Sequence, residues 1–300
     1  MAAPLVVLPS LIDISDRFNG ILLDAYGVFW GGNDVGLLPG SKEVMEKLVS
    51  CGTIVGILSN STQLASKEIQ KLHRHGLIQE QHFHFLVTSG EVTRSIFLDR
   101  QLPFETPNNT FWLFGGIHPK YSSPQAIFQD SVYNETSNID KADFIYISIP
   151  HIGGEDQTDP ELFRQELSDL KAKNLPMVCA NPDQFAHEGN PPRAVVRQGS
   201  IALMYEEMGG EVFYIGKPSN NAYTVAMKHF SKYKIDKPET ILMVGDTPET
   251  DIRGARLFDM PSALVTETGN MADRISRYGL AEALEAIPAD DKPDYYIGRL

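Results

Sequence analysis

The 300-residue sequence contains only two cysteines, Cys51 and Cys179, which lie far apart in the chain. So few cysteines argue against a disulfide-stapled scaffold and favour the reducing cytoplasm as the location. Long apolar runs are also missing, because no segment approaches the ~18 consecutive apolar residues that a membrane-spanning helix needs. The short apolar run near the start has no basic flank before it, so we expect neither a signal peptide nor a membrane partner.

Clusters of basic residues are absent as well. The formal net charge is −13, and no run of Lys or Arg is longer than two residues. An acidic surface repels phosphate backbones, which argues against nucleic acid as a partner. With 42% apolar and 22% charged residues, the composition is typical of a globular protein. Most of the carboxylates are therefore expected to be solvated and to have no specific role.

Apolar segments that predict strands alternate with segments in which apolar residues recur at helical spacing. Strands are predicted at residues 20–24, 53–58, 85–88, 211–216, 240–246 and 261–266, with a terminal edge strand at 293–300. Helices are predicted at 41–52, from about 65 to 76, at 200–210 and from about 223 to 230. Continuous apolar strands between amphipathic helices predict an α/β fold with a doubly wound parallel sheet that is covered on both faces.

The middle of the sequence has a different organisation. It has strand signals of its own at 110–116, 144–150 and 176–181, a helix from about 160 to 173, and loop-rich pieces at 150–160 and 183–193. We therefore predict two domains: residues 1–89 and 200–300 form the core domain, and residues 90–199 form an inserted α/β domain.

Polar residues follow four of the predicted strands. Asp24 ends the first strand, Ser59 the second, Lys217 follows 211–216, and Asp246 ends 240–246, with Asp251 five residues further on. In an open parallel sheet, ligands bind at the carboxyl ends of the strands. If these strands are neighbours, three carboxylates, a hydroxyl and an ammonium converge on one point. Asp24, Ser59 and Lys217 are each, taken alone, more typical of a turn or a helix cap. GDTPETD, which contains Asp246, is the stronger signal by itself, with a capped helix as its alternative, and the prediction depends on the joint occurrence of all four signals.

That set of groups suits phosphoryl transfer through a covalent aspartyl phosphate. A carboxylate nucleophile is repelled by a phosphate dianion, so a divalent cation with hard oxygen ligands has to lie between them. Asp24 and Asp246 could supply those ligands, together with a backbone carbonyl just after Asp24. Ser59 could hydrogen-bond phosphate oxygens, and Lys217 could neutralise developing charge and keep Asp24 ionised.

The ordered segments LLDAYGV, ILSNST, YIGKP and VGDTPETDI resemble the four motifs of the haloacid dehalogenase (HAD) superfamily. The segments LLPGSKEVMEKL and FLVTSGEVT, with the inserted domain, are similar to the type IIA subfamily of N-acetylglucosamine-phosphate and 4-nitrophenyl phosphatases. The resemblance covers nearly the whole chain. It implies a Mg²⁺-dependent hydrolase of a small phosphorylated metabolite. The inserted domain is then a cap that closes over the substrate and that could pair two copies in a homodimer.

The resemblance also implies a role for each matching residue. Asp24 is the implied nucleophile, and Lys217 is the lysine of the third motif. The implied phosphate-binding residues are Ser59, Asn60 and Gly27. The implied metal ligands are Asp24, the Tyr26 carbonyl, Asp246 and, in support, Asp251.

In the cap, the segment CANPDQF lies where such caps have a specificity loop. Asn181 and Asp183 are therefore candidates for contact with the substrate. The alternative is an Asx turn at the end of a strand, which needs no ligand.

Tyr26 departs from the family pattern, because phosphatases of the superfamily carry a general-acid aspartate two residues after the nucleophile. Tyrosine, with an ordinary pKa of about 10, is a poor replacement near neutral pH, so we expect restriction to good leaving groups. Two alternatives stay open. DAYG is similar to the first motif of the 2-haloacid dehalogenases, which displace halide without this acid and without a metal. The chain could also be a non-catalytic protein that binds a phosphorylated ligand.

Overall fold

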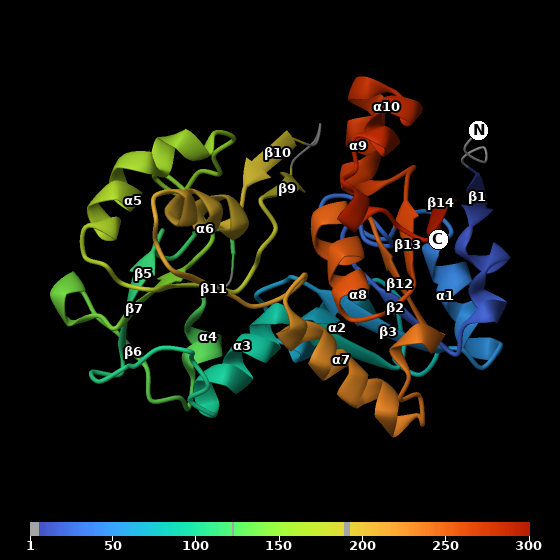
Figure 1. Cartoon of the computed structure of the whole chain (residues 1–300). Helices are drawn as coiled ribbons and strands as arrows, with labels where there is room; N and C mark the ends of the chain where they lie inside the picture. The colour runs from blue at the N-terminus through green and yellow to red at the C-terminus, as the bar shows by residue number, and fades with distance from the viewer. Residues whose placement is uncertain (1–5, 122, 189–192) are drawn as a thin grey trace. The chain divides into compact units, whose positions relative to one another are not determined.

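The computed structural model describes residues 6–121, 123–188 and 193–300, and the chain divides into two compact units. The first unit comprises Met1–Ser59 (described from residue 6), Ser66–Val87 and Lys217–Leu300. The second unit comprises Asn60–Ala65 and Thr88–Gly216. Each unit has its own sheet, whose strands are labelled in Figure 1, and its own cluster of buried apolar residues.

The first unit contains a seven-stranded sheet in the order β1-β14-β13-β12-β2-β3-β4. The strands are β1 (Val7–Ser10), β2 (Gly20–Leu23), β3 (Ile54–Ser59), β4 (Phe85–Thr88), β12 (Ile241–Gly245), β13 (Ser262–Val265) and β14 (Tyr295–Arg299). From β1 to β3, each strand pairs in parallel with its neighbours. The predicted α/β fold with a doubly wound parallel sheet is confirmed.

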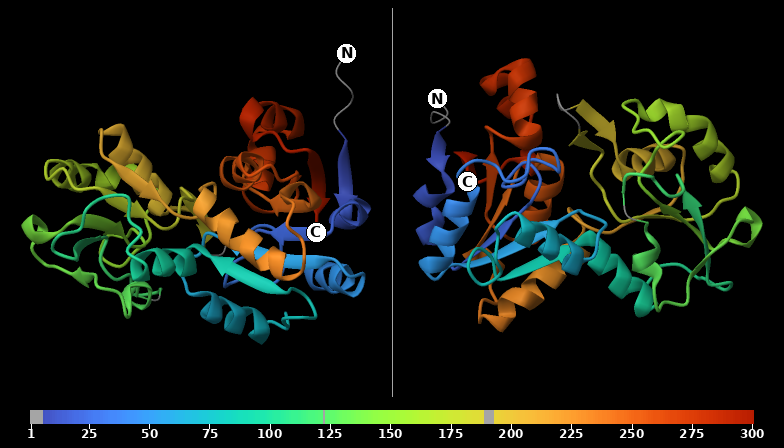
Figure 2. Two further views of the ribbon diagram at one scale, coloured as in Figure 1. Left: turned by 60° about the horizontal axis from the view of Figure 1, so that its bottom comes forward. Right: turned by 180° about the vertical axis from the view of Figure 1, so that it is seen from behind.

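Helices lie on both faces of this sheet (Figure 2). They are α1 (Ser41–Ser50), α2 (Ala65–Arg74), α7 (Asn220–Lys232), α8 (Arg253–Leu257), α9 (Gly269–Tyr278) and α10 (Leu280–Glu285). Strand β2 lies between β12 and β3, and all four of its residues are buried. This continuous apolar run fits a strand that is covered on both faces. The carboxyl end of β2 therefore lies beside the ends of the strands that carry Ser59 and Asp246.

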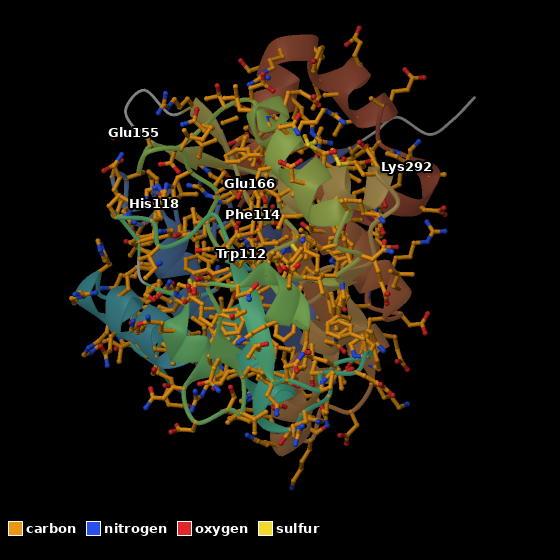
Figure 3. All side chains as sticks on the ribbon, turned by 90° about the vertical axis from the view of Figure 1, so that its left-hand side faces the viewer. Trp112, Phe114, His118, Glu155, Glu166 and Lys292 are labelled. Atoms are coloured by element: carbon orange, nitrogen blue, oxygen red, sulfur yellow. The ribbon has the colours of Figure 1, made fainter. Side chains whose placement is uncertain are left out.

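The second unit has a five-stranded sheet in the order β11-β8-β7-β5-β6, and all its pairs are parallel. Its strands are β5 (Thr110–Phe114), β6 (Asn134–Glu135), β7 (Phe144–Ile147), β8 (Met177–Cys179) and β11 (Val212–Tyr214). Its helices are α3 (Ser89–Leu98), α4 (Gln125–Phe128), α5 (Arg164–Lys171) and α6 (Gln198–Glu207). Phe114, labelled in Figure 3, belongs to a buried cluster with Ile145, Met177 and Tyr205.

The division of the chain differs from the predicted boundary at residue 200. The strand predicted at 211–216 is β11, which pairs with β8 of the second unit, so the chain returns to the first unit only at Lys217. An apolar segment of this kind predicts a strand, but it does not predict which of the two sheets the strand joins. Residues 60–65 also cluster with the second unit, because Ser89 Oγ donates to the carbonyls of Asn60 and Ser61.

Two other predictions about strands are wrong. The terminal strand β14 is not an edge strand, because β1 pairs with it on its outer side, with Val7 opposite Tyr296. The segment 183–193, predicted as loop-rich with no strand of its own, contains β9 (Phe185–Glu188), which forms an antiparallel pair with β10 (Arg193–Val196). Within the described ranges, no helix has the length and apolar character needed to cross a membrane.

Candidate active site

Three carboxylates of the first unit gather beyond the ends of β2 and β12. Asp24, Asp246 and Asp251 each offer an oxygen, and these oxygens lie within 4.8 Å of one another. The three residues are 8%, 3% and 1% exposed. Strands β2 and β12 are paired so that Leu23 lies opposite Val244, and the Asp24 N–H donates to the Val244 carbonyl at 2.8 Å. The adjacency of two parallel strands therefore brings Asp24 and Asp246 together.

Lys217 joins this group from the segment that follows β11. Its Nζ forms an ion pair with Asp24, and a second one with Asp251 at 2.7 Å. The lysine side chain is only 2% exposed. The prediction that it follows a neighbouring strand of the same sheet is wrong, because β11 belongs to the second unit. Lys217 reaches Asp24 as the first residue of the chain after its return to the first unit.

The charges of this group are not balanced. Burial raises the pKa of Asp24 well above its ordinary value, the Lys217 ammonium opposes that rise, and the Asp251 and Asp246 carboxylates add to it. Among the described residues, the ion pairs given for these three carboxylates come from the one ammonium of Lys217, and buried charges are costly unless they are paired. A divalent cation with oxygen ligands would relieve this repulsion.

Asp251 acts mainly on the backbone of its own loop. Its Oδ2 accepts hydrogen bonds from the N–H groups of Asp246 and Thr247, both at 3.1 Å. Its Oδ1 faces Lys217. Gly245 leaves room for this side chain, because a Cβ on Gly245 would lie 2.2 Å from the Asp251 Cβ. The geometry therefore places Asp251 where it holds Asp246 and Lys217 in position.

Two polar residues at Asp246 were not predicted from the sequence. The Asn270 N–H donates to Asp246 Oδ2 at 2.6 Å, and the Thr247 hydroxyl donates to Asp246 Oδ1 at 2.9 Å. The Asn270 side chain in turn donates to the Thr247 hydroxyl at 2.7 Å. Thr247 lies next to Asp246 in the motif, so its position was a usable signal. Asn270 lies in the first turn of α9, the helix after β13, and only the strand order shows that this helix begins beside Asp246.

Two glycines allow the surrounding loops to close on Asp246. Gly27 and Gly269 have φ values of +81° and +66°, and a Cβ would lie 2.2 and 2.0 Å from Asp246 Oδ2. Any other residue would be strained in its backbone and would overlap the carboxylate. The Thr268 hydroxyl donates to the Gly27 carbonyl at 2.5 Å and ties the two loops together. Gly27, predicted at the phosphate, thus lies directly against a predicted metal ligand.

The remaining predicted residues are divided between the units. Ser59, 5% exposed, ends β3 in the first unit. Asn60, Asn181 and Asp183 lie in the second unit. The Asn60 side-chain amide donates to Asp183 Oδ1, and the Asp183 N–H donates to Asn181 Oδ1, both at 2.9 Å. The second bond is the Asx turn that was the alternative explanation for Asn181.

Tyr26, two residues after Asp24, is 37% exposed and lies against helix α2. Lys71 Nζ donates to its hydroxyl oxygen at 3.5 Å and lies over its ring, 5.3 Å from the centroid. The same ammonium lies 5.0 Å from the centroid of the Trp30 ring and forms an ion pair with Glu68. Burial alone would lower the pKa of Lys71, but Tyr26 and Glu68 outweigh burial and raise it.

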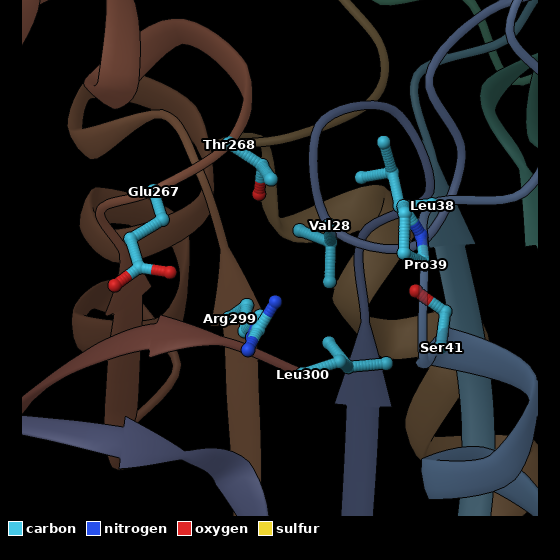
Figure 4. A pocket seen from close by; sticks show the side chains of 8 residues that line it. All are labelled: Val28, Leu38, Pro39, Ser41, Glu267, Thr268, Arg299 and Leu300. Atoms are coloured by element: carbon cyan, nitrogen blue, oxygen red, sulfur yellow. The ribbon is translucent and has the colours of Figure 1, made fainter.

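A cavity of about 220 Å³ lies in the first unit, between the segments that carry Val28 and Thr268 (Figure 4). The residues that line it are Val28, Leu38, Pro39, Ser41, Glu267, Thr268, Arg299 and Leu300. The cavity is smaller than most ligand sites, which measure about 300–1,000 Å³. None of the predicted site residues lines it, so it does not belong to the carboxylate group.

The matching protein family includes part of the buried carboxylate–lysine group. Residues 214–298 match the family described as HAD-hydrolase-like, and the matched segment contains Lys217, Asp246 and Asp251. The resemblance of the motifs to the haloacid dehalogenase superfamily is confirmed by this match.

Individual relatives match nearly the whole chain. Chronophin from Homo sapiens is 27% identical over 297 residues, which are 96% of this chain and 93% of chronophin. A hydrolase of the haloacid dehalogenase-like family from Brucella suis has a similar structure, with a TM-score of 0.78 at 22% identity, over 98% of this chain and 100% of that one. The 4-nitrophenylphosphatase of Thermotoga maritima has a TM-score of 0.63 at 23% identity, over 94% and 95% of the chains. At such identities, the two structures establish a shared fold.

Proposed function

We propose that the protein is a Mg²⁺-dependent phosphohydrolase that cleaves a small phosphorylated metabolite through an aspartyl phosphate on Asp24. The observation that carries the proposal is the buried group of Asp24, Asp246 and Asp251 with Lys217. The structural similarity to a 4-nitrophenylphosphatase supports hydrolysis of a phosphate ester as the reaction class. The second unit, which carries Asn181 and Asp183, is proposed as the cap, and pairing of two copies through it is part of the same proposal.

The donor set fits Mg²⁺. The ion prefers hard oxygen ligands, and three carboxylate oxygens lie within 4.8 Å of one another. Asp24 and Asp246 would hold it, together with the Tyr26 carbonyl, and Asp251 would support them through the loop of Asp246. When bound, Mg²⁺ neutralises the charge that would otherwise keep the nucleophile and the phosphate apart.

Each residue of the proposed site has its own role in the reaction. Asp24 attacks phosphorus, a P–O bond forms, and the bond to the leaving oxygen breaks with its electron pair on that oxygen. Lys217 keeps Asp24 ionised and stabilises the charge of the transferring group. Ser59 and the Asn60 segment bind phosphate oxygens. Water then attacks phosphorus, which releases inorganic phosphate and regenerates the Asp24 carboxylate.

The leaving group is where this chain differs from the usual pattern. With Tyr26 in place of the general acid, the position two residues after Asp24 carries no group that transfers a proton readily near neutral pH. The proposed substrates are therefore esters with good leaving groups, such as aryl and acyl phosphates. Halide displacement is the weaker alternative, since metal-independent chemistry does not need the carboxylates of Asp246 and Asp251.

The test is a screen of phosphorylated metabolites for phosphate release, with Mg²⁺ and with excess chelator. Release that requires Mg²⁺ supports the proposal. Binding of phosphorylated compounds without release would support a non-catalytic binding protein instead. Halide release from 2-haloacids that survives the chelator would support the dehalogenase alternative.

A further inference from the structure

The Asp246 carboxylate lies among like charges, so it needs partners that hold it in place. Asp24, Asp246 and Asp251 each place an oxygen within 4.8 Å of the others, and Asp246 is only 3% exposed. Like charges at such distances repel one another, and they do so more strongly in a buried place than in water. Before a cation binds, a carboxylate that is free to rotate would therefore turn away from the other two.

Both oxygens of Asp246 accept hydrogen bonds from neighbouring residues. Oδ2 accepts from the Asn270 N–H at 2.6 Å, and Oδ1 accepts from the Thr247 hydroxyl at 2.9 Å. Asn270 is the second residue of α9, and the first N–H groups of a helix have no partner inside the helix. The start of α9 can therefore hold Asp246 without giving up a hydrogen bond of the helix.

The side chain of Asn270 fixes the direction of the Thr247 hydroxyl. A hydroxyl has one proton to donate and an ionised carboxylate can only accept, so the proton of Thr247 points to Asp246. The Thr247 oxygen in turn accepts from the Asn270 side-chain amide at 2.7 Å. Asn270 thus acts on Asp246 in two ways, directly through its backbone N–H and indirectly through Thr247.

Helix α9 is itself anchored to the segment that carries Asp246. Arg274, four residues after Asn270, donates from its two terminal nitrogens to the two oxygens of Glu249, at 2.8 and 2.9 Å. Glu249 lies three residues after Asp246, and a guanidinium that makes two bonds to one carboxylate fixes orientation as well as distance. Met271 of the same helix is buried in an apolar cluster. The donors of Asn270 are therefore held in place beside Asp246.

We propose that Asn270 is a positioning residue for the Mg²⁺ site, which orients the Asp246 carboxylate directly and through Thr247. The inference rests on the proposed function, in which Asp246 is a metal ligand. The hydrogen bonds keep Asp246 turned towards the other two carboxylates, so the ion meets a ligand that is already oriented. Removal of a hydrogen-bond partner of a metal ligand typically weakens metal binding about 10–100-fold.

The experiment measures the Kd of Mg²⁺ by isothermal titration calorimetry, with MgCl₂ alone and no substrate. The variants are Asn270→Ala, Thr247→Val, which removes the hydroxyl at nearly constant shape, and the double variant. We expect about 10-fold weaker binding in Asn270→Ala, the lower end of the range, because the backbone N–H remains. Since the Asn270 side chain acts through Thr247, the double variant should bind no more weakly than Thr247→Val alone. Full additivity of the two losses would overturn the inference.

A second measurement separates positioning of Asp246 from a general structural role. At saturating Mg²⁺, the kcat of Asn270→Ala for 2,4-dinitrophenyl phosphate should return close to the native value, because the ion then fills the site in both proteins. A kcat that stays low would mean that the variant distorts the site, and it would overturn the inference. Ser276→Ala is the matched control, since Ser276 is an exposed residue of the same helix, and it should bind Mg²⁺ like the native protein.

Failure of the inference and failure of the proposed function give different results. If the native protein binds Mg²⁺ and Asn270→Ala binds it equally well, only the inference is refuted, whether or not the variant is less stable in urea. If the native protein neither binds Mg²⁺ nor releases phosphate in its presence, the proposed function fails and the inference fails with it.

Discussion

Lys217 and Asp24 form a buried ion pair although 193 positions separate them in the sequence. The lysine is also the residue at which the chain returns from the second unit to the first. Its second ion pair, with Asp251, links Asp24 to the loop that holds Asp246. The position of the Lys217 ammonium beside Asp24 therefore depends on where the chain returns to the first unit.

Metal binding should be measurable without any substrate. Asp246→Asn removes a charged oxygen ligand, so we expect weaker Mg²⁺ binding. A ligand present at 100 times its Kd stabilises the folded state by about 2.7 kcal/mol. The thermal midpoint of the native protein should therefore rise with Mg²⁺ and fall back when chelator is added, and the rise should be smaller in the variant.

Asp236→Asn, at an exposed position, is the control and should respond like the native protein. If Mg²⁺ leaves the native midpoint unchanged at every concentration, the metal site is refuted.

Gly269→Ala tests how closely the loops pack on Asp246. The change introduces strain at a positive φ, and its Cβ would lie 2.0 Å from Asp246 Oδ2. Overpacking of this kind costs about 1–3 kcal/mol in addition to the backbone strain. We expect a clear loss in the free energy of unfolding, measured with urea.

The matched control is Gly52→Ala. Gly52 also has a positive φ, +86°, but its added Cβ would meet no atom of the described residues within 4 Å beyond its chain neighbours. This control should show only the strain term, about 1–2 kcal/mol. Equal losses in the two variants would contradict the close packing at Asp246.

Replacement of Tyr26 by Asp should widen the substrate range. A carboxylic acid at this position could transfer a proton to the leaving oxygen, which typically contributes about 10²–10⁴ in rate. We expect a gain with alkyl phosphates and little change with dinitrophenyl phosphate, measured as phosphate release at near-neutral pH. If the native protein already cleaves alkyl and aryl phosphates at equal rates, another group supplies the proton and Tyr26 has no role in the leaving-group preference.

His118 should make the second unit sensitive to acid. Burial lowers the pKa of His118; Asp156 opposes this, while His151, Arg197 and Lys120 act in the same direction as burial. The unfolded chain, with an ordinary pKa of about 6.5, then binds more protons than the folded chain. Stability is therefore present above about pH 6.5 and is lost as the pH falls towards the lower folded value.

The geometry at His118 gives the same direction. Its Nδ1 accepts the Lys120 N–H at 3.1 Å, a hydrogen bond that a protonated Nδ1 could not accept. Urea unfolding, followed by Trp112 fluorescence in a Trp30→Phe background, should show a lower midpoint at pH 5.5 than at pH 7.5. His118→Asn, which keeps an acceptor near Nδ1, should weaken this dependence, and His73→Asn, at an exposed position, should not. An unchanged pH dependence in His118→Asn would contradict the account.

The sequence was sufficient for the features that depend on local patterns. Buried strands that end in Asp24 or Asp246 are visible as apolar runs followed by a carboxylate, and parallel pairing makes their convergence predictable. The placement of β11 was not predictable, because three apolar residues fit either sheet. The Lys71 contact was also missed, since it joins a turn to the surface of a helix 45 positions away. The substrate, the cytoplasmic location and the pairing of two copies stay predictions.

The most direct test of the central claim is chemical trapping of the phosphorylated nucleophile. The native protein is mixed with Mg²⁺ and 2,4-dinitrophenyl phosphate, then treated with borohydride, which reduces an acyl phosphate to an alcohol, and the peptides are analysed by mass spectrometry. We expect that Asp24 alone is converted to homoserine, and that chelator or omission of the ester prevents the conversion. Turnover with an unmodified Asp24, or with the modification at Asp246 or Asp251, would contradict it.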